Sequence, residues 1–231
     1  MQPITRKQIA KMPISAIVFD MDGILVDTEK YWQQARIELA RSVGQEWSLA
    51  DQMHLMGSNT TEWVTYTRAR LHLNHLTDTE VEASVRDRLL HYYETTLPLM
   101  PGAVEAVRLS AAHYPTALAS GSAHWAIEAI MRLTGLGDLF QVRVSADEVA
   151  HGKPKPDVFL EAARRLGVDP KQMVGIEDSG NGIRALKAAG MKAIAVPTPE
   201  IPLTAEVSAM ADVLLPSLAS YNLALLESLS D

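Results

Sequence analysis

The chain has 231 residues, of which 47% are hydrophobic and 21% are charged, and its net charge is −7. This composition is typical of a globular protein, and an acidic chain without a basic patch is unsuited to nucleic acid or to an anionic membrane surface. The absence of cysteine excludes disulfides, thiolate catalysis and zinc–thiolate sites, so a metal ion would need oxygen or imidazole ligands.

The N-terminal dozen residues are basic but lack the apolar core of a signal peptide. No apolar stretch in the chain approaches the roughly 20 residues that span a bilayer. We therefore expect a cytoplasmic protein that begins with a frayed leader.

The first predicted strand, Ala16–Phe19, is apolar throughout, which is typical of a central strand covered on both faces. After Glu29 the pattern becomes helical for some 65 residues. Helices are predicted at 30–43, Thr60–Leu71 and Thr79–Tyr93, the last with an apolar stripe that includes Val81, Val85 and Leu89. No convincing strand falls in this segment, which indicates a helical insertion.

Strands and helices alternate after Pro98 and Pro101–Gly102. The elements predicted there are helix 102–113, strand Thr116–Ala119, helix 123–134, strand Val142–Val144, helix 156–166, strand Met173–Ile176, helix 179–189, strand Lys192–Val196, strand Val213–Leu215 and helix 218–228. This alternation predicts an α/β fold with a doubly wound parallel sheet. Residues 13–29 and 97–231 would form the core, and residues 30–96 the inserted helical subdomain.

Polar residues follow the first predicted strand directly. Asp20 and Asp22 stand at the carboxyl end of this strand, where ligands bind in such sheets, and Gly23 comes next. Strand alternation would turn both carboxylates to the same side, although a turn that begins at Asp22 could redirect the second. The pattern Asp-x-Asp-Gly is also an ordinary strand-to-turn signal.

Three later segments carry similar polar clusters. Ser120-Gly121-Ser122 follows a strand and suits phosphate oxygens, but Ser122 could equally be a helix cap. Lys153 lies in a loop stiffened by prolines, where it could be held in place or could simply be solvated. Glu177 and Asp178 end a further apolar strand, and Ser179 after them is suited to cap a helix.

The order Asp-x-Asp, then Ser, then Lys, then Glu-Asp resembles the four motifs of the haloacid dehalogenase superfamily, in its phosphatase and phosphomutase branch. The resemblance covers nearly the whole chain, and it implies that residues 30–96 are the small helical cap of that family. Dehalogenases lack the second aspartate, because a halide leaves without a proton. Asp22 therefore favours phosphorus chemistry.

The resemblance also implies a role for each motif residue. Asp20 would attack phosphorus and form an aspartyl phosphate, and Asp22 would serve as general acid and base. Ser120 and Lys153 would neutralise and orient the transferring group, and Gly121 would add a backbone N–H donor. Lys153-Pro154 is expected to be a cis peptide bond, and the protein is expected to be a monomer.

Mg²⁺ is the cofactor that the resemblance implies. Its ligands would be the Asp20 carboxylate, the main-chain carbonyl of Asp22 and the Asp178 carboxylate, with Glu177 acting directly or through water. Converging carboxylates would repel a phosphate unless a divalent ion intervened, and Mg²⁺ prefers oxygen ligands.

The chain most resembles the β-phosphoglucomutase and sugar-phosphate phosphatase group. Mutases of this group carry a histidine and an arginine in the cap, where this chain has Trp32 and, counted from Gly57, Thr60. We therefore expect hydrolysis of a small phosphate ester, a sugar or hexitol phosphate, with a phosphomutase as the alternative.

Cap residues would select the substrate. Thr28 and Trp32 resemble the Ser/Thr-x-x-x-Trp pattern of phosphatases that act on deoxyhexose and hexitol phosphates, although Trp32 could also be a core aromatic residue of the cap. Ser122, Trp32, Asn59 and Thr60 are the predicted substrate contacts, and Trp63 is a further candidate for selectivity.

Overall fold

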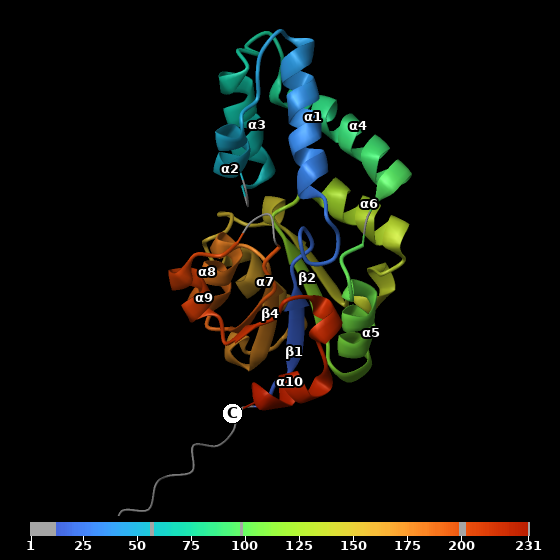
Figure 1. Ribbon diagram of the computed structural model, residues 1–231, viewed down its shortest axis with the longest axis vertical. Coiled ribbons are helices and arrows are strands. Elements are labelled where there is room, and N and C mark those ends of the chain that lie inside the picture. The colour runs from blue at the N-terminus through green and yellow to red at the C-terminus, as the bar shows by residue number, and fades with distance from the viewer. Residues whose placement is uncertain (1–12, 56–57, 98, 199–201, 231) are drawn as a thin grey trace, which may run out of the picture.

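The computed structural model describes residues 13–55, 58–97, 99–198 and 202–230 (Figure 1). The expected leader, Gly57 and Pro98 lie outside these residues. Six parallel strands form one sheet in the order β3-β2-β1-β4-β5-β6, which confirms the doubly wound α/β fold. The strands are β1 (Ala16–Phe19), β2 (Thr116–Ser120), β3 (Val142–Ser145), β4 (Met173–Glu177), β5 (Lys192–Ala195) and β6 (Val213–Leu214).

Both faces of the sheet are covered, and the residues of β1 divide between them. Ile17 and Phe19 pack in one apolar cluster, with α5 (Ala103–His113), α6 (His124–Thr134) and α10 (Leu223–Ser228). Ala16 and Val18 pack in a second cluster, with α7 (Asp157–Leu166), α8 (Gly180–Ala188) and α9 (Ala205–Met210). An apolar strand without alternation is therefore explained by burial on both sides.

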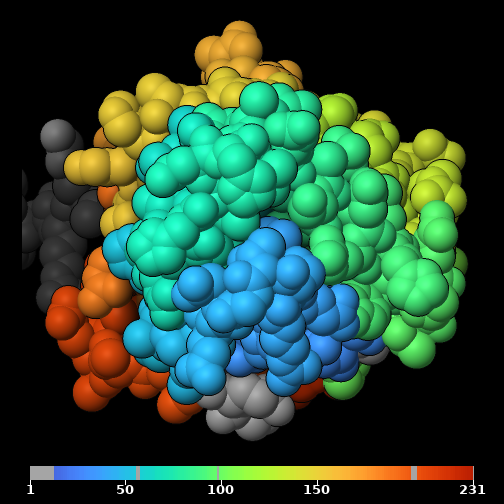
Figure 2. All heavy atoms as spheres, turned by 90° about the horizontal axis from the view of Figure 1, so that it is seen from above, coloured from blue at the N-terminus to red at the C-terminus, as the bar shows by residue number. Residues whose placement is uncertain are grey.

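Four helices lie together at one end of the molecule, beyond the carboxyl ends of the strands (Figure 1). They are α1 (Glu29–Ser42), α2 (Leu49–Leu55), α3 (Thr60–Arg70) and α4 (Asp78–Thr96), and we call them the cap. Seen from above, they cover the centre of the core (Figure 2). The stripe Val81, Val85 and Leu89 is buried, as the helical period of α4 predicts.

Three features differ from the expected elements. α2 was not expected, because this helix is short and buries Asp51 and Gln52 as well as Leu55, so it has no apolar stripe. α9, a short helix that Thr204 caps, was not expected either. The expected helix 218–228 is wrong as a single element, since a 3₁₀ turn at Leu218–Ser220 precedes α10 and Asn222 caps a new helix.

Within the described residues, no helix has the length and apolar character needed to cross a membrane.

Candidate active site

The candidate site lies at the carboxyl ends of three neighbouring strands. β2, β1 and β4 are adjacent in the sheet, so the residues that end or follow them meet at one edge. Asp20 continues β1, and its backbone N–H donates to the Ile176 carbonyl at 3.0 Å. Ser120 ends β2 and Glu177 ends β4. All three side chains are buried.

Lys153 joins two of these strand ends. Its Nζ donates to Asp20 Oδ1 at 2.6 Å and to Glu177 Oε1 at 2.8 Å, and its side chain is only 3% exposed. The peptide bond Lys153-Pro154 is cis, as expected. The alternative of a solvated lysine is therefore wrong, and the cation lies against the carboxylate expected to act as nucleophile.

Burial and charge act on this ion pair together. Burial raises the pKa of Asp20 to about 7; Lys153 opposes this shift, and the charges of Glu177 and Asp22 add to it. Burial alone would lower the pKa of Lys153, but Asp20 and Glu177 raise it above its usual value. The ammonium is thus protonated at neutral pH, and it supports the charged form of Asp20.

Asp22 has different surroundings from Asp20, because hydroxyl groups surround it. Ser122 Oγ donates to Asp22 Oδ2 at 2.7 Å and Ser120 Oγ donates to the same oxygen at 3.2 Å, while the Thr28 hydroxyl donates to Oδ1. The carboxylate is held at the start of the connection that leads into the cap. Two aspartates with different partners are suited to two different roles.

The serines of the loop after β2 are positioned by further hydrogen bonds. Ser120 Oγ accepts from the Ser122 backbone N–H at 2.9 Å, and Ser145 Oγ donates to the Ser122 carbonyl at 2.8 Å. Gly121 lies between the two serines in this loop. The alternative that Ser122 caps a helix is wrong, because α6 starts after Ala123 without a side-chain cap.

Three acidic groups form a cluster beside Lys153. Oxygens of Asp20, Glu177 and Asp178 lie within 4.8 Å of one another. Burial raises the pKa of Asp178 well above its usual value, and the charges of Glu177 and Asp20 raise it further. Such crowding of oxygen donors fits a hard divalent cation such as Mg²⁺.

Two glycines make room for the acidic cluster. Gly23 has a φ of +78°, and a Cβ atom there would lie 2.1 Å from Asp178 Oδ2. A Cβ atom at Gly182 would lie 1.6 Å from Glu177 Oε1. Glu177 is further fixed because its Oε2 accepts from the Ser179 backbone N–H at 2.7 Å, while Ser179 caps α8 as predicted.

Tryptophans meet where the cap contacts the core. The Trp32 ring lies 5.9 Å from the Trp63 ring within the cap and 6.1 Å from the Trp125 ring of α6. Trp125 Nε1 also donates to Glu82 Oε1 of the cap at 3.1 Å. Trp32 is therefore both a packed aromatic residue and a residue of the cap–core boundary.

The other two predicted cap contacts have partners of their own. Asn59 caps α3 by accepting from the Glu62 backbone N–H. The Thr60 backbone N–H and hydroxyl donate to the two carboxylate oxygens of Asp147 in the core, both at 3.0 Å. Thr60 thus does lie on the side of the cap that faces the core.

Sequence reasoning missed a polar group inside the cap. Gln52 Nε2 donates to Glu29 Oε1 at 2.6 Å, and Arg36 Nη1 donates to Gln52 Oε1 at 3.0 Å. Tyr93 of α4 is also buried, and it interacts electrostatically with Glu29 and Arg36. Arg36 follows Trp32 by one helical turn, a spacing that could have indicated a shared face.

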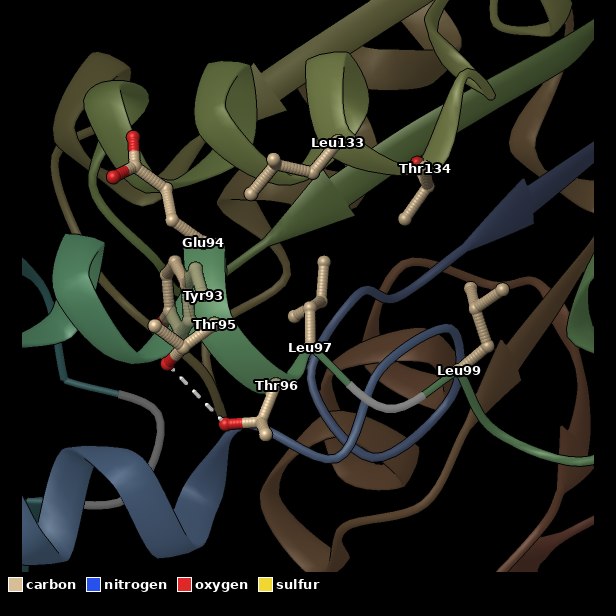
Figure 3. Close-up of a pocket in the computed structure, with 8 residues that line it drawn as sticks. All are labelled: Tyr93, Glu94, Thr95, Thr96, Leu97, Leu99, Leu133 and Thr134. Atoms are coloured by element: carbon tan, nitrogen blue, oxygen red, sulfur yellow. Dashed lines mark hydrogen bonds between the residues drawn. The ribbon is translucent and has the colours of Figure 1, made fainter.

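A cavity of about 380 Å³ lies elsewhere, where the end of α4 meets α6 (Figure 3). Its described lining includes Leu97, Leu99 and Leu133 and none of the motif residues. Among the motif residues, Asp20, Ser120, Lys153 and Glu177 are buried, and Asp22 and Asp178 are half-buried.

Comparison with known proteins agrees with this geometry. The haloacid dehalogenase-like hydrolase family matches residues 14–190. The chain belongs to this family. It is 38% identical to hexitol phosphatase B of Escherichia coli over 81% of this chain and 85% of that protein. It is 37% identical to the fructose-1-phosphate phosphatase YqaB of the same organism, over 79% of this chain and 96% of that protein.

Solved structures share the fold. CbbY from Rhodobacter sphaeroides, in complex with phosphate, matches with a TM-score of 0.80 and 29% identity, over 93% of this chain and 99% of that one. A β-phosphoglucomutase from Clostridium difficile also has a TM-score of 0.80, but at 22% identity it shows the fold alone. The family and its relatives identify this protein as a phosphatase.

Proposed function

We propose that the protein is a Mg²⁺-dependent phosphatase that hydrolyses a sugar or hexitol monophosphate through an aspartyl phosphate on Asp20. The observation that carries this proposal is the different surroundings of the two aspartates: Asp20 lies against Lys153 in the acidic cluster, and Asp22 lies among hydroxyls next to the cap. Asp20 would attack phosphorus, and Asp22 would transfer protons.

In the first step, a carboxylate oxygen of Asp20 attacks phosphorus and the ester P–O bond breaks. Asp22 gives its proton to the departing alkoxide. Lys153 and the Ser120 hydroxyl hold the phosphoryl oxygens in place, which is most of what phosphoryl transfer requires of a protein.

In the second step, Asp22 takes a proton from water. The water oxygen attacks phosphorus, the bond between phosphorus and the Asp20 oxygen breaks, and inorganic phosphate leaves with the Asp20 carboxylate restored. The same group thus acts first as acid and then as base.

The carboxylates of Asp20 and Asp178 and the main-chain carbonyl of Asp22 would hold Mg²⁺, and Glu177 would act directly or through water. When bound, the ion would neutralise the negative charge that gathers between the phosphate and these carboxylates.

The substrate class is supported by the relatives named for hexitol and fructose 1-phosphate hydrolysis. The arginines of α3 bear on a different point, the choice between hydrolysis and a mutase reaction. Within α3, Arg68 already pairs with Asp78 and Arg70 with Asp51. A mutase must retain a bisphosphate, and water is the simpler acceptor here.

The test is incubation of β-glucose 1-phosphate with a trace of the 1,6-bisphosphate, following glucose 6-phosphate and inorganic phosphate together. We expect phosphate release that stops on chelation of Mg²⁺. Asp20→Asn should release none above background, while Asp27→Asn, at an exposed neighbour, serves as the matched control. Isomerisation far faster than phosphate release would favour the mutase.

A further inference from the structure

The polar group inside the cap has hydrogen-bonding capacity that the protein itself does not use. Arg36 is 5% exposed and Tyr93 is 1% exposed. Arg36 Nε and the Tyr93 hydroxyl are buried without a hydrogen-bond partner among the described residues. Thr67 Oγ1 and Arg68 Nε in α3 also lack a partner in that part of the chain, but Arg36 and Tyr93 both interact electrostatically with Glu29. Buried polar atoms are nearly always paired, so the unpaired atoms of this group point to a ligand.

Arg36 is held rigidly. Its guanidinium carbon lies 4.9 Å from the Trp32 ring and 5.6 Å from the Trp63 ring, and Nη1 donates to Gln52 Oε1. A guanidinium has five N–H donors, and the structure pairs one of them within the described part of the chain. The two aromatic rings pack against the cation, and its Nε has no partner among the described residues.

Glu29 supplies an acceptor next to these donors. Its Oε1 accepts from Gln52, while its Oε2 has no donor among the residues described. Glu29 directly follows Thr28, whose hydroxyl donates to Asp22. Burial raises the pKa of Glu29, and the charge of Asp22 adds to this shift while Gln52 and Arg36 oppose it. Glu29 thus lies near Asp22, the carboxylate proposed to transfer protons.

Tyr93 belongs to the same group although it comes from α4. Burial raises the pKa of Tyr93 well above its usual value, and the charges of Asp22 and Glu29 act in the same direction, while Arg36 and the neighbouring Trp32 side chain oppose them. The hydroxyl is therefore within electrostatic reach of Asp22, Glu29 and Arg36 at once.

We propose that Glu29, Arg36 and Tyr93 form the subsite that binds the hydroxyl groups on the carbon chain of the substrate, with Trp32 beside its C–H groups. A carboxylate accepts, a guanidinium donates and a phenol does both, which matches a polyol. This inference rests on the proposed function and adds that the Glu29 carboxylate disfavours a second phosphate at the far end of the substrate.

The test compares a hexitol 6-phosphate with acetyl phosphate, which has no hydroxyl chain, by kcat/KM. Tyr93→Phe removes only the unpaired hydroxyl, and Glu29→Gln removes only the charge. We expect each to lower the ratio of the two kcat/KM values by about tenfold, the effect of one lost hydrogen bond of 1.4 kcal/mol. Tyr92→Phe and Glu38→Gln, which break a contact on the outer side of the cap, should leave the ratio unchanged.

A second measurement separates binding from structure. A hydroxyl without a protein partner adds little to folding, so Tyr93→Phe should keep the melting temperature of the wild type. If a folded Tyr93→Phe variant keeps the wild-type ratio of the two kcat/KM values, the proposed subsite is wrong. It is also wrong if the melting temperature falls and kcat/KM falls equally on both substrates. In Glu29→Gln, kcat/KM for a hexose 1,6-bisphosphate should rise relative to the monophosphate, and no rise would contradict the role of the charge.

The substrate preference of the wild type tests the proposed function separately from the subsite. If it hydrolyses acetyl phosphate and does not prefer the hexitol phosphate, the substrate class is wrong and the subsite falls with it. If it does prefer the hexitol phosphate while the variants retain that preference, the substrate class stands and the subsite alone is wrong.

Discussion

Among single residues, Asp22 is notable because it lies in the turn after β1 and contacts three hydroxyl groups. The Ser120, Ser122 and Thr28 hydroxyls all donate to it, so its orientation is fixed by three groups from two segments of the chain. A general acid and base must be held in this way, since proton transfer requires hydrogen-bond distance to the reacting atom.

Asp22→Asn should therefore separate the two chemical steps. With p-nitrophenyl phosphate, whose leaving group needs no proton, the first step continues while hydrolysis of the aspartyl phosphate slows by about 10²–10⁴-fold. We expect a burst of nitrophenol equal to the enzyme concentration, followed by slow turnover, in stopped-flow absorbance. Linear release at the wild-type rate would show that Asp22 does not act as the base.

Gly23 makes room for Asp178 in the acidic cluster because it has no side chain. Gly23→Ala places a Cβ atom against Asp178 and imposes left-handed backbone strain. We expect a loss of about 1–2 kcal/mol in the free energy of unfolding from the strain alone, together with a higher Mg²⁺ concentration for half-maximal activity.

Gly44→Ala is the matched control. Its φ of +67° imposes similar strain, but nothing lies within 4 Å of the added Cβ atom. Urea unfolding should show the loss from strain in both variants, with a further loss from the Asp178 contact in Gly23→Ala, and the Mg²⁺ requirement should change in Gly23→Ala alone. If both variants need the same Mg²⁺ concentration for half-maximal activity, the room that Gly23 leaves beside Asp178 does not matter for metal binding.

At the scale of elements, the cap is organised around the buried carboxylate of Asp51 in α2. Tyr66 Oη donates to Asp51 Oδ1 at 2.7 Å, Arg70 Nε donates to the same oxygen at 2.9 Å, and the Ser48 hydroxyl donates to Oδ2 at 2.7 Å. Burial alone would raise the pKa of Asp51, but these hydrogen bonds lower it well below its usual range.

The pH dependence of stability follows from this shift. A carboxylate with a lowered pKa stabilises the folded state above its unfolded pKa of about 4, and this contribution is lost as the pH falls below that value. Asp51→Asn should cost about 2–3 kcal/mol in the free energy of unfolding at pH 7, and less at pH 3. Urea unfolding at both pH values measures the difference.

Asp87→Asn on the outer face of α4 is the control for this experiment. Its side chain is 72% exposed, so the substitution should change stability by less than about 0.5 kcal/mol. If Asp51→Asn lowers the free energy of unfolding equally at pH 7 and pH 3, the charge of Asp51 does not stabilise the folded state.

Much of the core and its motifs could be predicted from the sequence, because neighbouring residues along the chain carry the pattern. β1 and β4 are short apolar segments that end in carboxylates, and in a parallel sheet such ends meet at one edge. Lys153 could be placed by resemblance, but its two partners are visible only when β1 and β4 are adjacent.

The cap was harder to predict because its polar residues are paired across helices. α2 has no apolar period, since Asp51 and Gln52 are buried through contacts with α1 and α3. The neighbourhood of Arg36 and Tyr93 likewise depends on the packing of α1 against α4. Local patterns carry no information about such pairs.

For the molecule as a whole, we expect the cap to control access to the candidate site. The side chains of Asp20, Ser120 and Lys153 are buried, although the substrate must reach them from solvent. Opening therefore has to separate cap from core, and the Thr60 contact with Asp147 is one that must break.

The chain has no cysteine, which makes this motion simple to block. In a Thr60→Cys, Asp147→Cys variant, a short bismaleimide should join cap and core and reduce turnover of acetyl phosphate to that of the unreacted fraction. The same variant before reaction with the reagent serves as the reference. Full turnover after cross-linking would show that substrate enters without movement of the cap.

The contact between Trp32 and Trp125 gives the protein a natural optical signal. Three of its four tryptophans, Trp32, Trp63 and Trp125, lie together at the cap–core boundary, and Trp47 is buried within the cap beside Tyr66. When the cap separates, water reaches the Trp32 and Trp125 indoles, and their fluorescence shifts to longer wavelength while Trp47 stays constant. Opening and closing during a single turnover can thus be followed without any attached dye.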